Sequence, residues 1–445
     1  MKDNKNFIRI GSGAGYSGDR IDAAIELAKY GNIDYLCFEC LAERTIALAQ
    51  LEKSIHPDLG YDPLLKVRME AVLDICIQNK IKIITNMGAA NPKAAAELVR
   101  NLTKKLGYEH IKIAYVTGDD VTNLIMNNDF PILERPISTK DFSDSIISAN
   151  AYLGASPIVQ ALRSGANIVI TGRVADPALF LAPIIYEFNW SFDDYHLLGK
   201  GTMIGHLLEC AGQITGGYFA DPPKKTIANL AHLGFPYADI FNDGNCEISK
   251  VENSGGIITT QTCTEQLLYE IHDPKKYYTP DVIADFSAVY FEEKSKNHIY
   301  ATGATGQAKP DNYKVSIGYK AGYIGEGQIS YGGISAFERA SLAIEILKER
   351  LSQYAFEDIR FDYIGANSLF PTSPNNTFNH PEIRIRVAAR STDISLAKLI
   401  GNEVEALYTN GPAGGGGAMK SIKPVVAVLS TFIPQDIITT NVTFI

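Results

Sequence analysis

The sequence has little of what marks several large classes of protein. Its 445 residues include six cysteines and one tryptophan, and 50 acidic residues outnumber 41 lysines and arginines for a net charge of -9. Apolar runs stay well short of the roughly 18 residues that a membrane span requires, so we expect no membrane segment. Lysine and arginine adjoin one another only in pairs. That distribution argues against binding to a nucleic-acid backbone.

The cysteines are too few and too irregularly spaced for a disulfide framework. We therefore expect reduced thiols and a cytoplasmic protein. The N-terminus leads directly into a strand-like run, so no signal peptide is expected. Cys37 and Cys40 form a C-x-x-C pair, but in an extended segment they face opposite sides, and no second pair completes a zinc site.

The first ~190 residues alternate short β-branched runs with amphipathic helical patterns. This alternation predicts an α/β fold with a mostly parallel sheet covered by helices on both faces. The predicted strands are 7–10, 34–38, 81–85, 111–116 and 167–171, and the predicted helices are 20–30, 41–52, 63–79, 92–106 and 157–164.

Beyond residue 195 the pattern changes twice. Residues 195–305 are rich in glycine, with short strands such as Gly256–Gln261. From about residue 310, strand and helix patterns alternate again and predict a smaller α+β unit with a mostly antiparallel sheet. We expect residues 1–305 to form an α/β core domain with the active site, and residues 306–445 to form the α+β domain.

Polar, glycine-bearing loops follow several of the predicted strands. Loops that leave parallel strands at one edge surround the crevice where open α/β sheets bind ligands, although each loop by itself could be a plain turn. We expect the segment around His206 to cover this crevice. The residues expected to line it are Gly13, Asn86, Asp119, Asn150 and Arg173.

The first of these loops partly fits a dinucleotide-binding motif. Gly13-Ala-Gly15-Tyr-Ser17-Gly18 satisfies G-x-G-x-x-G, and Glu39 closes the next strand about 20 residues later. However, the glycine that directly follows the strand is Gly11, from which the spacing fails, and Asp19 places negative charge where phosphates would lie. Gly13, Gly15 and Ser17 are therefore expected in a ligand loop or a turn, and the signal for NAD is not strong.

Two charged pairs stand near later strand ends. Asp119 and Asp120 could hold Mg²⁺ or Mn²⁺ or act as an acid/base pair, or one of them could cap a helix. Arg173 could hold a carboxylate or phosphate, with Asp176 orienting it, and the alternative is a surface ion pair. Asn150 supplies amide donors before the helix that begins near residue 157.

The segment from Gly205 to Gly217 concentrates polar side chains between glycines. If it is helical, His206, Glu209 and Cys210 share one face. We expect His206 and Glu209 to perform general acid/base catalysis, with Gln213 near the substrate. A metal site would need more ligands, a buried structural histidine is the alternative, and Cys210 would need a positive neighbour to act as a nucleophile.

Residues 410–417 contain five glycines, including Gly415. A run of free backbone N–H groups can form an anion-binding nest. The same run could equally be a flexible loop that becomes ordered at an interface. We include Gly415 among the candidate substrate-binding residues.

Taken together, the motifs resemble those of the AtuA family, named after acyclic terpene utilisation protein A. They span almost the whole chain, although Cys37 and Cys40 depart from the expected residues. The motifs lie at residues 13–19, 34–43, 118–120, 148–155, 171–176, 205–210 and 264–270.

The resemblance implies a role in the degradation of branched acids, because the founding members belong to citronellol and geraniol breakdown through CoA thioesters. It suggests a lyase or hydratase but assigns no catalytic residue. Some relatives carry an additional C-terminal ferredoxin-like unit. We expect this chain to lack that unit and a small partner protein to supply it.

The sequence thus predicts an enzyme that acts on a small carboxylate or its CoA thioester by acid/base chemistry, and we expect a homo-oligomer. Arg173 would hold the carboxylate, and His206 or Glu209 would move the proton. Two alternatives remain open: a non-catalytic ligand-binding or assembly subunit, and an NAD-dependent oxidoreductase. The cofactor is not identified by any motif.

Overall fold

The computed structural model describes residues 7–370 and 381–445. The chain forms two compact units: the first runs to Gly318 and resumes at Val428–Ile445, and the second covers Tyr319–Ala427. The chain enters the second unit within β14 (Asn312–Gly332) and leaves it within β17 (Gly415–Pro434). These units differ from the predicted ranges 1–305 and 306–445, because the last residues return to the first unit.

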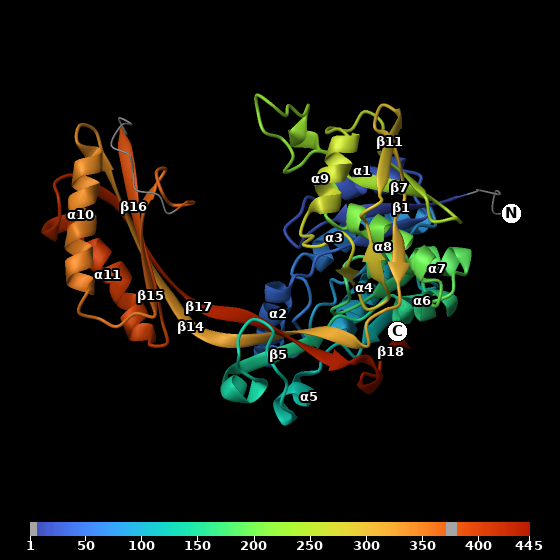
Figure 1. The fold of residues 1–445 in the computed structure, drawn as a ribbon, viewed down its shortest axis with the longest axis horizontal. Coiled ribbons are helices and arrows are strands. Elements are labelled where there is room, and N and C mark those ends of the chain that lie inside the picture. Colours follow the sequence, from blue (N-terminus) through green and yellow to red (C-terminus); the bar gives the residue numbers. More distant parts are fainter. Residues whose placement is uncertain (1–6, 371–380) are drawn as a thin grey trace. The chain divides into compact units, whose positions relative to one another are not determined.

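The first unit is built on a mixed sheet, in which the described residues provide ten strands (Figure 1). Five central strands are parallel and confirm the predicted α/β core: β1 (Phe7–Ala14), β2 (Tyr35–Phe38), β3 (Lys82–Thr85), β6 (Ile168–Ile170) and β4 (Ile113–Thr117). Antiparallel strands extend both sides: β7 (Pro236–Phe241), β8 (Cys246–Lys250), β12 (His298–Thr302) and β11 (Tyr290–Ser295) beyond β1, and β18 (Asn441–Phe444) beyond β4.

Helices pack against both faces of the parallel strands. Leu36 and Phe38 of β2 share an apolar core with α1 (Asp22–Tyr30), α3 (Leu65–Gln78) and α4 (Pro92–Lys105). Successive strand residues face opposite sides, and the thiol of Cys37, between them, donates to the Leu179 carbonyl in α7 (Ala178–Phe188) at 3.4 Å. β2 is therefore buried on both faces, as expected for a central parallel strand.

Helix α8 (Tyr195–Glu209) brings the polar segment around His206 to the sheet. Asp194 caps its N-terminus by accepting a hydrogen bond from the Leu197 N–H at 3.1 Å. Gly205 lets this helix approach its neighbour closely, because a Cβ there would lie 2.7 Å from the Pro177 carbonyl oxygen. The predicted helical stretch around His206 is thus the last turn of a longer helix.

The first unit also contains helices and short strands outside the ten-stranded sheet. The strand predicted at Gly256–Gln261 is wrong, because Thr259 caps a helix there by accepting a hydrogen bond from the Thr262 N–H at 3.2 Å. The helices and strands of the first unit outside its large sheet are α2 (Glu43–Ile55), α5 (Thr122–Asn127), β5 (Ile146–Ala151), α6 (Ser156–Arg163), α9 (Thr260–Leu268), β9 (Tyr277–Tyr278), β10 (Ile283–Asp285) and β13 (Thr305–Gln307).

The second unit has the element order β-α-β-β-α-β, with α10 (Ala336–Leu351), β15 (Asp358–Ile364), β16 (Glu382–Ser391) and α11 (Ile394–Asn410) between β14 and β17. The strands lie in the order β15-β16-β14-β17, and β16 pairs antiparallel with both neighbours. This is the topology of a ferredoxin-like unit. Residues of both helices and of β14 and β16 form its apolar core.

A ferredoxin-like unit is therefore part of this chain, between Tyr319 and Ala427. The expected ferredoxin-like partner protein stays a prediction. Among the helices of the described residues, none combines the length and the apolar character needed to cross a membrane.

Candidate functional site

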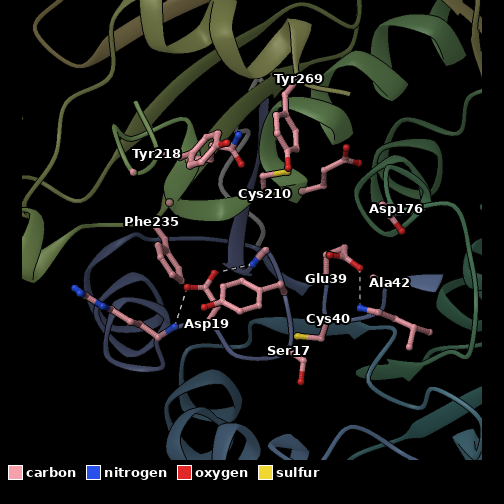
Figure 2. Close-up of a pocket in the computed structure, with 18 of the residues that line it drawn as sticks. Ser17, Asp19, Glu39, Cys40, Ala42, Asp176, Cys210, Tyr218, Phe235 and Tyr269 are labelled. Atoms are coloured by element: carbon pink, nitrogen blue, oxygen red, sulfur yellow. Dashed lines mark hydrogen bonds between the residues drawn. The ribbon is translucent and has the colours of Figure 1, made fainter. Parts of the chain in front are cut away.

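A cavity of about 730 Å³ lies in the first unit where β1, β2 and α8 end (Figure 2). The carboxyl ends of parallel strands are where open α/β sheets bind ligands, and this volume is typical of small-molecule sites. The predicted crevice is thus present at the predicted edge, but its walls come from other residues. They are provided by segments 15–20, 39–45, 209–218, 230–235 and 269–270, and by Asp176.

Carboxyl groups dominate the polar part of this wall. Burial raises the pKa of Asp19 and Asp176, raises that of Glu39 to about 8, and holds that of Glu209 well above its ordinary value. Burial also opposes ionisation of Glu43, but a hydrogen bond from Tyr152 lowers its pKa to about 2. The carboxyl side chains that line the cavity are Asp19, Glu39, Glu43, Asp176, Glu209 and Glu270.

Glu209 reaches the cavity from the last turn of α8, with His206 behind it. His206 Nδ1 lies 2.7 Å from Glu209 Oε1, and His206 Nε2 lies 3.2 Å from the Leu267 carbonyl oxygen. The side chain of His206 is 2 % exposed and packs against the rings of Tyr277 and Phe286. The two predicted acid/base residues are therefore adjacent, but only Glu209 lines the cavity.

The hydrogen bonds of His206 indicate which atom carries the proton shared between His206 and Glu209. A carbonyl oxygen can only accept, so Nε2 carries a hydrogen toward Leu267. Burial lowers the pKa of His206 to about 4, so the ring is neutral near pH 7 and Nδ1 has no hydrogen. Glu209 must then donate from Oε1, as a carboxylic acid. Its other oxygen, Oε2, has no hydrogen-bond partner among the described residues.

Glu39 faces the same cavity from the end of β2. Its Oε1 accepts hydrogen bonds from the Leu41 N–H at 2.8 Å and from Asn86 Nδ2 at 3.0 Å. Because these donors occupy Oε1, a proton on this carboxyl resides on Oε2. Asn86 also accepts from the Cys40 N–H at 2.8 Å. The predicted ligand-binding residue Asn86 thus braces the wall behind Glu39 and does not line the cavity.

Arg173 is buried behind the wall, with 1 % of its surface exposed. Its guanidinium donates to the Leu41 carbonyl, to Asp176 and, at 2.9 Å, to the Val174 carbonyl. The group also lies over the Tyr152 ring, 4.3 Å from its centroid. Arg173 therefore orients Asp176, which lines the cavity, in place of the expected contact with a substrate carboxylate.

Asp119, Asp120 and Asn150 form a separate polar network. Asp119 Oδ2 accepts hydrogen bonds from the Arg173 N–H at 2.9 Å and from Asn150 Nδ2 at 3.0 Å. Asp120 accepts from the Thr122 N–H at 3.1 Å at the start of α5. These residues tie together the loops after β4 and β6 and strand β5. None of the three lines the cavity.

In the glycine loop after β1, the side chain of Asp19 folds back and bonds to the backbone of the loop. Asp19 Oδ2 accepts a hydrogen bond from the Gly15 N–H at 2.9 Å, which a phosphate would need in a dinucleotide site. Buried Arg68 holds the loop by donating to the carbonyls of Ser17 and Asp19 at 2.9 and 2.7 Å. Gly15 and Ser17 line the cavity, as expected for a ligand loop.

Of the other candidate residues from the sequence, some line the cavity and others lie elsewhere. Gln213 and Cys210 line the cavity, but burial raises the pKa of the Cys210 thiol, which disfavours the nucleophilic thiolate. Gly13 lies behind the wall against the Phe38 ring, and Gly415 begins strand β17 in the second unit. The described residues contain no group of three His, Cys, Asp or Glu side chains arranged to hold a metal ion.

Sequence reasoning considered Glu39 only as the acid of a dinucleotide-binding motif, and it missed Glu43 and Glu270 as site residues. Glu39 and Glu43 belong to the motif at residues 34–43, and Glu270 ends the motif at 264–270. Glu39 follows β2, Glu43 begins α2 and Glu270 follows α9, so the place of each in a motif of the family was the available signal. Composition could not show that burial would gather these carboxyls in one cavity.

Comparison with known proteins agrees with the sequence motifs. A family model described as acyclic terpene utilisation family protein AtuA matches residues 8–444. The chain belongs to the AtuA family. No curated protein and no solved structure matched it. Both compact units of this AtuA-family chain fall within the matched range, so the family domain includes the ferredoxin-like unit.

The contact between the glycine loop and α8 can be tested at Gly15. A Cβ there would lie 2.5 Å from the Cys210 carbonyl carbon, so Gly15→Ala must push the end of α8 away. We expect a loss of roughly 1–3 kcal/mol in unfolding free energy. Gly416→Ala is the matched control, because a Cβ there meets nothing within 4 Å. Urea unfolding measures both, and equal stabilities would contradict this contact.

Asp119 makes stability depend on pH in a defined direction. Burial raises its pKa from 3.8 to about 6, so the folded state retains the proton longer than the unfolded chain. Relative to Asp119→Asn, the wild type should lose up to about 3 kcal/mol of unfolding free energy between about pH 4 and pH 7. Urea titrations across that range test this, with the exposed Asp58→Asn controlling for one lost charge. A constant difference would refute it.

Proposed function

We propose that this AtuA-family protein is a lyase or hydratase that moves protons with Glu209 and Glu39. The observation that carries the proposal is the His206–Glu209 hydrogen bond of 2.7 Å beside a cavity, with Glu209 Oε2 left unpartnered among the described residues. A second carboxyl, Glu39, lines the same cavity. Two carboxyls with different anchoring can serve as acid and base in one reaction.

Glu209 is the proposed base. When Oε2 takes a proton from carbon or water, the proton on Oε1 can pass to Nδ1 of His206 across the existing hydrogen bond. The resulting imidazolium lies 5.2 Å from the ring of Tyr277 and 5.8 Å from that of Phe286, centroid to centroid. Aromatic faces stabilise a cation by ~0.5–2 kcal/mol. His206 is thus a positioning residue that holds the proton which Glu209 gives up.

Glu39 is the proposed acid. With its pKa near 8, it is protonated at neutral pH and can donate from Oε2 to a leaving hydroxyl or a carbonyl oxygen. The Leu41 N–H and Asn86 hold Oε1, so the donor is fixed in direction. Acid and base on one cavity are what addition or removal of water across a carbon–carbon double bond requires.

The charge of the wall favours a CoA thioester over a free carboxylate as substrate. A carboxylate would enter a cavity lined by six carboxyl groups, with Arg20 as the lining cation and Arg173 engaged behind the wall. A thioester is uncharged at its reacting end and avoids that repulsion. We place this activity in the cytoplasm, where six unpaired cysteines would stay reduced.

An NAD-dependent reaction is the weaker alternative, because Asp19 occupies the glycine-loop N–H that would bind a pyrophosphate. A non-catalytic ligand-binding subunit is the remaining one. It would be favoured if the chain bound enoyl-CoA thioesters without hydrating them, with and without an added partner protein.

Glu209→Gln should lower kcat/KM by ~10²–10⁴-fold, the usual loss for a general acid or base. His206→Ala should cause a similar loss, because residues that act as a unit are not additive. The rate at which each variant hydrates short enoyl-CoA thioesters is measured by monitoring the loss of enoyl absorbance. The exposed Glu252→Gln is the matched control. A folded Glu209→Gln protein that turns over at the wild-type rate would exclude Glu209 as the base.

The proposed acid gives the reaction an alkaline limit. Because burial raises the pKa of Glu39 to about 8, kcat/KM in the dehydration direction should fall as the pH rises through that value. Glu39→Gln should be slower and should lose this limb, since an amide does not ionise there. Profiles of kcat/KM between pH 6 and pH 10 test this. An unchanged alkaline limb in the variant would assign it to another group.

A further inference from the structure

A second cavity adjoins the carboxyl-lined one and has the opposite character. This α2 cavity, of about 530 Å³, lies along α2 and shares Ser17, Leu41 and Thr45 with the first cavity. Most of the residues that line it are apolar. Leu41, Ala49 and Ala89 form its buried floor and belong to one apolar cluster. A ligand that reacts among the carboxyls can therefore extend an apolar substituent into the α2 cavity.

Helix α2 contributes an apolar stripe to this cavity. Thr45, Leu48, Glu52 and Ile55 follow one another at steps of three or four residues, so they lie on one face of the helix. On this face Leu48 is 44 % exposed and Ile55 is 65 % exposed, whereas Ile46 on the opposite side is buried in the core. Aliphatic surface left in water is unfavourable, and an apolar ligand that covers it stabilises the complex.

The charges at the α2 cavity indicate which end of a thioester enters it. Its ionisable side chains are Glu52, His56 and Asp62, and no lysine or arginine of the described residues lines it. The CoA end of a thioester carries amides and phosphates, which require hydrogen-bond donors and cations. An acyl chain requires only apolar surroundings. The acyl end is therefore the part that this cavity fits.

We infer that the α2 cavity binds the acyl chain of the substrate, and that Leu48 and Ile55 favour chains longer than four carbons. This inference rests on the proposed function for the thioester and for the reaction among the carboxyls. It adds the substrate class, which is a thioester of an apolar, medium-length acid. The stripe from Thr45 to Ile55 extends over about 15 Å of helix, so a four-carbon chain leaves most of it uncovered.

Saturated thioesters test the binding step by itself, because they have no double bond to hydrate. Calorimetry on the full chain compares butyryl-CoA, hexanoyl-CoA and octanoyl-CoA. We expect the dissociation constant to fall by ~4-fold for each added methylene, which corresponds to ~0.8 kcal/mol. The heat capacity change of binding should become more negative with chain length, because apolar surface is removed from water.

Two variants test the α2 cavity directly. Leu48→Gln should reduce the gain in affinity per methylene, and Thr45→Phe should abolish it, because Thr45 lies where the two cavities meet. Leu342→Gln is the matched control, because Leu342 is 47 % exposed but belongs to α10 in the second unit. The control should keep the full gain. Urea unfolding shows whether each variant is folded, and Leu48→Gln alone decides the test if Thr45→Phe is not.

Equal affinities for the three thioesters, or an undiminished gain in Leu48→Gln, would overturn the inference. A changed oligomeric state of Leu48→Gln with an unchanged gain would also overturn it, and would assign the stripe to contact with a second copy. If chain length has no effect while Glu209→Gln still abolishes turnover, the inference falls and the proposed function stands. If the gain depends on Leu48 but no enoyl-CoA thioester is hydrated, the acyl-chain site stands and the proposed reaction falls.

Discussion

The buried guanidinium of Arg173 is the constraint on which the site depends. A cation with 1 % of its surface exposed is unstable unless its donors are satisfied, and removing a partner from such a group typically costs about 3–5 kcal/mol. The partners are the carbonyl of Leu41 after β2 and the carboxyl of Asp176 after β6. The backbone of Arg173 itself is held by Asp119 after β4. Three strand ends are thus fixed relative to one charge.

This arrangement separates the loops at the sheet edge into two layers. Behind the cavity, Asp119 joins the loops after β4 and β6 by accepting from the Arg173 N–H. Asn86 after β3 and the guanidinium of Arg173 after β6 bond to the loop after β2. The loops after β1 and β2, with the end of α8, present side chains to the cavity. Asn86 and Arg173 thus hold Glu39 and Asp176 at the cavity without lining it themselves.

The sequence predicted the parallel strands, most helices and the edge of the sheet where the cavity lies, because buried β-branched runs and amphipathic helices have distinct periods. It could not predict which strand-end residues would face inward. Asn86 and Asp119 have the same local pattern whether they bind a ligand or another loop. The glycine-rich start of β17 was equally ambiguous, because Gly415 has no side chain to reveal that it begins a strand beside β14.

The carboxyl groups of the cavity affect one another's protonation, and their neighbours fix their direction. Glu209 and Glu39 are each anchored through one oxygen, by His206 and by Asn86 with the Leu41 N–H, so both point their remaining oxygen in a fixed direction. Burial, and after it repulsion from Asp176, raises the pKa of both glutamates, while Arg173 lowers it. The protonation of each glutamate therefore depends on the charges around the cavity as well as on its own burial.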